Sequence, residues 1–256
     1  MLVFLTALAA AYLGLCAFLF LSQRAMLYPA PKHRGRPAGM GEVIEVPGGT
    51  PMLWRPARLD GSVVVHFHGN GEQVTDSGWL GEELAQRGVS FAAVEYPGYP
   101  GAAGLPSESS IVSAAERALQ HLTTSMGIAP NRIVLSGQSL GAGVAVTLAA
   151  KGWGRKLALL SPYTSLPVVA ERGVLRLFPV RLLMLDRFDS ASRAPQIDKP
   201  VLVLHGNRDE VIPFEDGRRL ARRFPHARFV EIDGAYHNDL WGRPPTLAEY
   251  LAFVAG

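Results

Sequence analysis

The sequence predicts an α/β protein built on a mostly parallel sheet with helices on both faces. Six short apolar runs lack the strict alternation of a half-exposed strand, as expected for strands buried on both faces. Helical patterns separate most of these runs, and alternating strands and helices with short loops form parallel sheets. Right-handed crossovers would then bring the carboxyl ends of the strands to one edge, where ligands bind.

The elements follow one another in a regular order after an opening hairpin. The hairpin is predicted over Glu42–Val46 and Pro51–Arg55. The later strands are expected at Ser62–Phe67, Val89–Val94, Arg132–Ser136, Lys156–Leu160, Val201–Leu204 and, more weakly, Arg228–Ile232. The helices are expected at Val74–Arg87, Ser107–Met126, Leu140–Ala150, Glu215–Phe224 and Thr246–Val254. One connection, residues 161–200, is longer than usual and is interpreted as a short helical cap above the sheet edge.

Length and composition narrow the classes of protein that remain. A chain of 256 residues with 48% hydrophobic and 18% charged residues fits one globular domain plus an apolar segment. The net charge is only +3, and no Lys/Arg tract is interleaved with aromatic residues, so no nucleic-acid partner is predicted. Cys16 is the single cysteine, which excludes an internal disulfide and a cysteine-based metal cluster.

The first 21 residues carry no charged side chain and predict one N-terminal transmembrane helix. About 20 apolar residues are needed to cross a bilayer as a helix. A retained single-pass anchor is favoured over a cleaved signal, because no Lys or Arg precedes the apolar run and no small-x-small site follows it. The predicted division is therefore an anchor over 1–21, a juxtamembrane linker over 22–41 and a globular α/β domain over 42–256. The side of the membrane is left open, since a long domain can translocate despite the basic residues that follow the helix.

The motif that carries the most chemistry is Gly137-Gln138-Ser139-Leu140-Gly141. It follows a predicted strand and precedes a helix of small residues, which is the context of a nucleophile elbow. The turn is tight, so the residues flanking Ser139 must lack bulk. The alternative is a plain glycine-rich turn, because G-x-S-x-G alone is a common pattern. The strand–turn–helix context favours Ser139 as a nucleophile.

A nucleophilic serine needs a base and a group that orients the base. His237 is the predicted base, since it lies in the loop after the last strand. Asp209 is the predicted third member, because it follows the penultimate strand at the same sheet edge. Glu210 and Asp198 are the competing carboxylates, but Glu210 lies further into the loop and Asp198 precedes its strand.

Acyl transfer also requires donors for a developing oxyanion. The main-chain N–H groups of Leu140 and Asn70 are predicted to supply them, the latter from the loop His68-Gly69-Asn70-Gly71. His66 and His68 form an H-x-H pair that could suggest a metal, but no third ligand is evident. Neither a metal nor an organic cofactor is expected.

Four motifs in order resemble those of a known family. HFHGNGE, GQSLGAG, HGNRDEVIP and GAYHNDL follow an apolar N-terminal helix and an R-x-M-L-Y-P-x-P segment. Together they resemble α/β-hydrolases of the Bem46 and ABHD12/13/17-like group of membrane-anchored serine hydrolases, from about Arg24 to the end of the chain. The resemblance implies the α/β-hydrolase fold, the triad Ser139, Asp209 and His237, and Asn70 with Leu140 as oxyanion donors. It also implies a membrane location and acyl or lipid-like substrates.

The predicted function is therefore hydrolysis of carboxylic ester or thioester bonds through a serine triad and an acyl-enzyme. A serine peptidase or amidase is the alternative enzyme, since the same triad cleaves amides. A non-catalytic, membrane-tethered binding protein is the alternative outside enzymes, because a fold does not fix a function. Protein partners, acyl length and the role of the cap at a lipid surface are left open.

Overall fold

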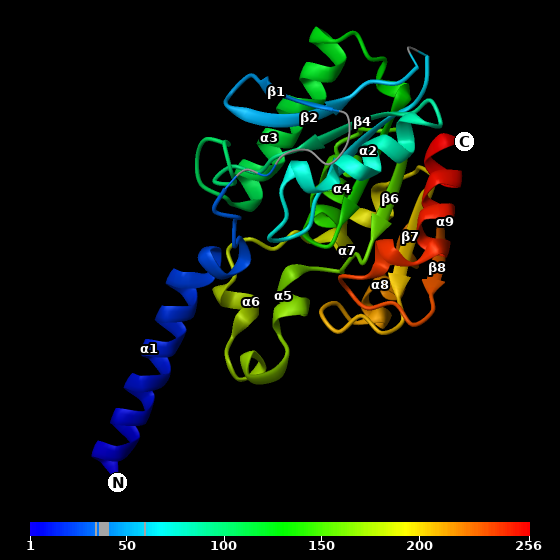
Figure 1. The fold of residues 1–256 in the computed structure, drawn as a ribbon. Helices are drawn as coiled ribbons and strands as arrows, with labels where there is room; N and C mark the ends of the chain where they lie inside the picture. Colours follow the sequence, from blue (N-terminus) through cyan, green and yellow to red (C-terminus); the bar gives the residue numbers. More distant parts are fainter. Residues whose placement is uncertain (34, 36–40, 59) are drawn as a thin grey trace.

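The protein is a single mixed sheet covered by helices, with a long helix projecting from one side (Figure 1). The computed structural model describes residues 1–33, 35, 41–58 and 60–256. Its eight strands run in the order β1-β2-β4-β3-β5-β6-β7-β8. Pairings from β4 through β8 are parallel, whereas β2 pairs antiparallel with both β1 and β4. The predicted mostly parallel α/β fold is confirmed.

The strands lie close to their predicted positions. The opening hairpin is β1 (Glu42–Val46) and β2 (Thr50–Arg55). The remaining strands are β3 (Val63–Phe67), β4 (Ser90–Val94), β5 (Ile133–Gln138), β6 (Lys156–Leu160), β7 (Val201–Gly206) and β8 (Ala227–Ile232). β3, β4, β5 and β7 are buried along their whole length, as their continuous apolar sequences require.

Two hydrophobic clusters place the helices on opposite faces of the sheet. α3 (Glu108–Gln120), α4 (Leu140–Ala150) and α8 (Phe214–Ala221) pack in the first cluster. α2 (Gly78–Ala85) and α9 (Pro244–Ala255) pack in the second. α4 is apolar on all sides because it is buried on all sides, between the sheet and its neighbouring helices.

The predicted helix over residues 74–87 is divided in the structure. A 3-10 turn, η1 (Val74–Ser77), precedes α2. The capping box between Gln73 and Asp76 tightens the first turn, and Gly78 and Gly81 weaken helix propensity in the second part. Similarly, the predicted helix over residues 107–126 is divided into α3 and a π-helical turn, η2 (His121–Ser125), that follows it directly.

The N-terminal helix α1 (Leu2–Leu27) continues six residues past the predicted anchor. The polar residues Ser22 to Arg24 do not break it, and Pro29 ends it by forcing Tyr28 out of helical geometry. α1 is long and apolar enough to cross a bilayer by length and composition. Part of the predicted linker, residues 34 and 36–40, lies outside the described residues. The division into anchor, linker and domain remains a prediction.

The long connection between β6 and β7 consists of short helical pieces. These are α5 (Leu166–Ala170), η4 (Gly173–Leu177), α6 (Val180–Leu183), α7 (Ser190–Arg193) and η5 (Ala194–Gln196). Figure 1 shows α5 and α6 below the sheet edge and beside α1. We refer to residues 161–200 as the cap.

Candidate active site

Ser139 lies at a sharp turn between β5 and α4. Its backbone has φ 51° and ψ −117°, a positive φ that a non-glycine residue adopts at a cost. The flanking glycines make this turn possible. A Cβ at Gly137 would lie 2.2 Å from the carbonyl oxygen of Gly141, and a Cβ at Gly141 would lie 1.9 Å from the carbonyl oxygen of Phe67. The structure thus has the backbone geometry that a nucleophile elbow requires.

The three predicted triad side chains are connected by hydrogen bonds at one edge of the sheet. The Oγ of Ser139 is 3.0 Å from Nε2 of His237, and Nδ1 of His237 is 2.8 Å from Oδ2 of Asp209. Each residue follows the carboxyl end of a parallel strand: β5, β7 and β8. His237 and Asp209 are buried, whereas Ser139 keeps partial exposure.

Asp209 is held as a carboxylate by several donors. Its Oδ1 accepts from the main-chain N–H of Val211 at 3.0 Å and of Ile212 at 2.7 Å. Burial raises the pKa of Asp209, but hydrogen bonds from His205 and His237 outweigh burial and hold this pKa well below its ordinary value. An ionised Asp209 can orient His237 through Nδ1–H and stabilise an imidazolium at that position.

The competing carboxylates lie elsewhere. Asp198 is exposed and pairs with His226 at 2.9 Å, away from the carboxyl ends of the strands. Glu210 accepts the main-chain N–H of His237 at 3.2 Å and does not contact the imidazole ring. Glu210 therefore fixes the backbone of the His237 loop, and Asp209 alone of these three meets the ring.

The two predicted oxyanion donors lie on segments that pack against each other. Leu140 is the first residue of α4, where main-chain N–H groups lack partners within the helix. Asn70 lies in the turn after β3 and is exposed. The close approach of Gly141 to the carbonyl oxygens of Phe67 and His68 sets this turn directly beside the start of α4.

A buried pair that the sequence reasoning missed supports the same turn. Nδ1 of His68 donates to the carbonyl oxygen of Gly69 at 2.8 Å, Nε2 lies 3.0 Å from Oε1 of Glu95, and the side chains of His68 and Glu95 are fully buried. Burial lowers the pKa of His68, but the hydrogen bond and charge of Glu95 raise it above the ordinary value. A lone acidic residue directly after a buried strand was the available signal for Glu95, since buried carboxylates need partners.

His66 and His68 bond to different partners. Nδ1 of His66 is 3.0 Å from the hydroxyl of Ser136, whereas His68 bonds to Glu95. Within the part of the chain that the structure describes, no group of three or more His, Cys, Asp or Glu residues is arranged to hold a metal ion.

Comparison with known proteins assigns the chain to a class. The family model described as "alpha/beta hydrolase fold" matches residues 180–244. An uncharacterised protein of Mycobacterium tuberculosis is 34% identical over 239 residues, which is 88% of this chain and 84% of that protein. The chain belongs to the α/β-hydrolase superfamily.

Two further similarities refine this assignment. Human alpha/beta hydrolase domain-containing protein 17C is 36% identical over 151 residues, which is 57% of this chain and 43% of the human protein. A monoacylglycerol lipase of Paleococcus ferrophilus has the same fold, with a TM-score of 0.62 at 21% identity, over 80% of this chain and 97% of the lipase. The resemblance to ABHD-type hydrolases is confirmed.

Proposed function

We propose that this protein is a serine hydrolase that cleaves carboxylic ester or thioester bonds of acyl or lipid-like substrates. The observation that carries the proposal is the chain of contacts from Asp209 through His237 to Ser139, at 2.8 and 3.0 Å. An esterase or lipase activity would agree with the superfamily and with the monoacylglycerol lipase that shares the fold.

The proposed mechanism has two half-reactions. Ser139 Oγ attacks the acyl carbonyl while Nε2 of His237 takes its proton, and Asp209 stabilises the imidazolium. The main-chain N–H groups of Leu140 and Asn70 donate to the oxyanion of the tetrahedral intermediate. His237 then gives its proton to the departing alcohol or thiol. Water, activated by the same imidazole, releases the acyl group as a carboxylic acid and restores Ser139.

We also propose that α1 attaches the protein to a membrane as a single-pass N-terminal anchor. Large apolar side chains along its first 21 residues are exposed, among them Leu2, Val3, Leu13 and Leu21. An isolated apolar surface of this length is expected to be covered by hydrocarbon.

The catalytic proposal is tested with a fluorophosphonate probe and a p-nitrophenyl ester series from acetate to palmitate in non-ionic detergent. We expect labelling and hydrolysis by the wild type and neither by Ser139→Ala. The chain-length optimum would define the size of the acyl site.

The surface pair Asp198–His226 provides a matched control for the buried pair Asp209–His237. Asp209→Asn and His237→Gln should lower hydrolysis by about a thousandfold or more, because the first removes the charge that orients His237 and stabilises its imidazolium, and the second removes the base. Asp198→Asn and His226→Gln remove an exposed Asp–His contact of similar length and should retain full activity. A folded wild type with no labelling and no hydrolysis of any ester would refute the proposal.

A further inference from the structure

The cap is held along α1 by directed contacts at two levels. Near the middle of α1, the ring of Tyr12 stacks on Phe178 with centroids 5.5 Å apart, and its hydroxyl donates to the carbonyl of Leu177 at 3.1 Å. Near the end of α1, Arg24 forms an ion pair with the buried Asp186 at 3.2 Å. These contacts fix the cap to the helix over about half of its length.

The position of these contacts sets the depth of the cap. A helix rises 1.5 Å per residue, so Tyr12 lies about 18 Å from Arg24 along α1. Arg24 is the first charged side chain of the sequence and marks the polar end of the apolar segment. With a hydrocarbon core about 30 Å thick, Tyr12 lies inside it when α1 crosses a bilayer. Phe178 and Leu177 then lie inside it as well.

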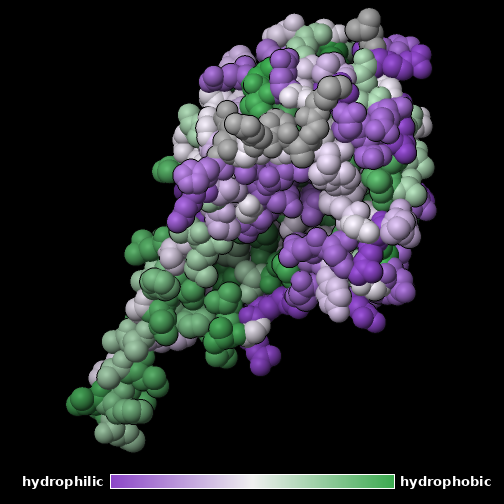
Figure 2. Space-filling model, viewed as in Figure 1, coloured by the Kyte–Doolittle hydropathy of each residue, from purple (hydrophilic) through white to green (hydrophobic). Residues whose placement is uncertain are grey.

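Large apolar side chains form much of the outer surface of the cap, with the exposed Arg176 and Arg181 among them. Leu182 is 85% exposed, and Val174, Leu177 and Leu185 are exposed by half or more. Figure 2 shows the green, hydrophobic surface of α1 continuing onto the neighbouring cap, while hydrophilic side chains dominate the rest of this face. An apolar patch that is continuous with a candidate membrane helix is expected to contact lipid, as the helix does.

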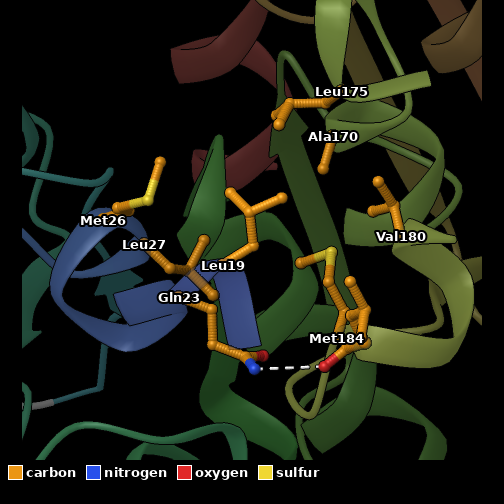
Figure 3. Close-up of a pocket in the computed structure, with 9 residues that line it drawn as sticks. Leu19, Gln23, Met26, Leu27, Ala170, Leu175, Val180 and Met184 are labelled. Atoms are coloured by element: carbon orange, nitrogen blue, oxygen red, sulfur yellow. Dashed lines mark hydrogen bonds between the residues drawn. The ribbon is translucent and has the colours of Figure 1, made fainter. Parts of the chain in front are cut away.

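An apolar cavity of about 200 Å³ lies between α1 and the cap (Figure 3). Its lining is almost wholly aliphatic or thioether: Leu19, Met26, Leu27, Ala170, Leu175, Val180, Leu183 and Met184, with Gln23 as the polar member. The amide of Gln23 is already occupied. Its Nε2 donates to the carbonyl of Leu183 at 3.1 Å, and its Oε1 accepts from the N–H of Leu185 at 2.8 Å. The cavity therefore offers apolar contacts to a ligand.

We propose that this cavity binds an acyl chain of a bilayer phospholipid. On the side of α1 it extends from Leu19 to Leu27, across the polar end of the apolar segment at Arg24, so hydrocarbon chains adjoin it at Leu19 when α1 crosses a membrane. A peptide would bring backbone N–H and C=O groups that lack partners here, whereas an acyl chain needs none. The proposal rests on the membrane attachment proposed above and is independent of the chemistry of Ser139.

The test uses the full chain in phosphatidylcholine vesicles that contain a small fraction of phospholipid with a diazirine in the middle of one acyl chain. After irradiation, adducts are located by peptide mass spectrometry. We expect adducts on Leu183 and Met184 as well as on outward residues of α1 such as Leu13. The same pattern is expected for Ser139→Ala, because binding needs no catalysis.

Two variants that fill the cavity from the cap side serve as blocks. Ala170→Trp and Leu175→Trp should each abolish the adducts on Met184 while leaving those on Leu13. Ala252→Trp, on the exposed side of α9, is the matched control and should leave the pattern unchanged. Adducts on Leu13 with none on Leu183 or Met184 would overturn the acyl-chain site, as would adducts on Met184 that persist in both blocking variants. An absence of all adducts would overturn the anchor and the site together, while ester hydrolysis in detergent would still report separately on the triad.

Discussion

The imidazole of His205 contacts the carboxylate of Asp209, which is also hydrogen-bonded to His237. Nε2 of His205 lies 3.3 Å from Oδ2 of Asp209, the oxygen that is 2.8 Å from Nδ1 of His237. Nε2 also lies 3.1 Å from the carbonyl oxygen of Ile212, so both of its neighbours are acceptors and Nε2 carries the proton. Two imidazoles thus meet at the same oxygen of Asp209.

This arrangement predicts that His205→Phe lowers kcat by about tenfold with little change in KM, because a hydrogen bond to a charged group is worth about 1.5–3 kcal/mol. The ring must keep its size and shape, since a Cβ at Gly217 would lie only 2.0 Å from Nδ1 of His205. Steady-state kinetics on a p-nitrophenyl ester would measure both constants. His226→Phe, on the exposed surface, should leave them unchanged. An unaltered kcat in folded His205→Phe would show that His205 has only a packing role.

Gly141, two residues after Ser139, is predicted to be important for the stability of the fold. Gly141→Ala places a methyl group 1.9 Å from the carbonyl oxygen of Phe67, so β3 and α4 must separate. We expect the free energy of unfolding to fall by at least about 3 kcal/mol, at the upper end of overpacking costs. Gly242→Ala is the control, because its Cβ would meet no atom within 4 Å. Thermal melting of both variants in detergent checks the difference; similar melting temperatures would contradict it.

The sheet could be predicted because its strands are buried on both faces. Residues such as Val63–Phe67 and Ile133–Gln138 must be apolar throughout, which leaves a pattern distinct from the amphipathic helices. Ser139, Asp209 and His237 were found together for a related reason. Parallel strands end at one edge, so residues that follow different strands meet there even when about 100 residues separate them.

Contacts across elements left weaker signals. The role of His205 depends on how the loop after β7 folds back onto its own strand, and a histidine at a strand end does not reveal this. The docking of the cap on α1 joins Tyr12 to Phe178 and Gln23 to Leu183, pairs that no local periodicity relates. The helix predicted over residues 74–87 is divided because a capping box and glycines interrupt it, and the spacing of its apolar residues does not show this interruption.

The strained turn at Ser139 predicts a gain in stability when the side chain is removed entirely. Ser139→Gly relieves the cost of φ 51°, which is about 1–3 kcal/mol for a non-glycine residue, but adds freedom to the unfolded chain worth up to about 1 kcal/mol. Ser139→Ala keeps the strained φ. We therefore expect Ser139→Gly to melt about 2–4 °C above Ser139→Ala, with both inactive. Equal melting temperatures would mean that the turn stores no strain.

The buried His66 predicts a specific loss of stability in mild acid. Tyr250 donates to the hydroxyl of Ser136 at 2.8 Å, and that hydroxyl forms a hydrogen bond with Nδ1 of His66 at 3.0 Å. Burial lowers the pKa of His66 to about 3, so the ring stays neutral in the folded protein. An unfolded histidine takes up a proton below about pH 6.5. The unfolded state therefore binds more protons between these values, and stability falls as the pH falls through that window.

His66→Gln should remove this dependence while keeping a polar group beside Ser136. Between pH 6.5 and 5 the wild type should lose about 1.6 kcal/mol more than the variant, since each pKa unit corresponds to about 1.4 kcal/mol and the unfolded histidine is already half protonated at pH 6.5. Melting temperatures of both proteins across this range give the difference. The subtraction cancels groups that do not interact with His66. His68 is not one of them, because its charge also lowers the pKa of His66. The raised pKa of His68 itself acts in the opposite direction, since its contribution is lost as the pH rises. Parallel pH profiles for the two proteins would show that His66 is protonated in the folded state and that its burial is incomplete in solution.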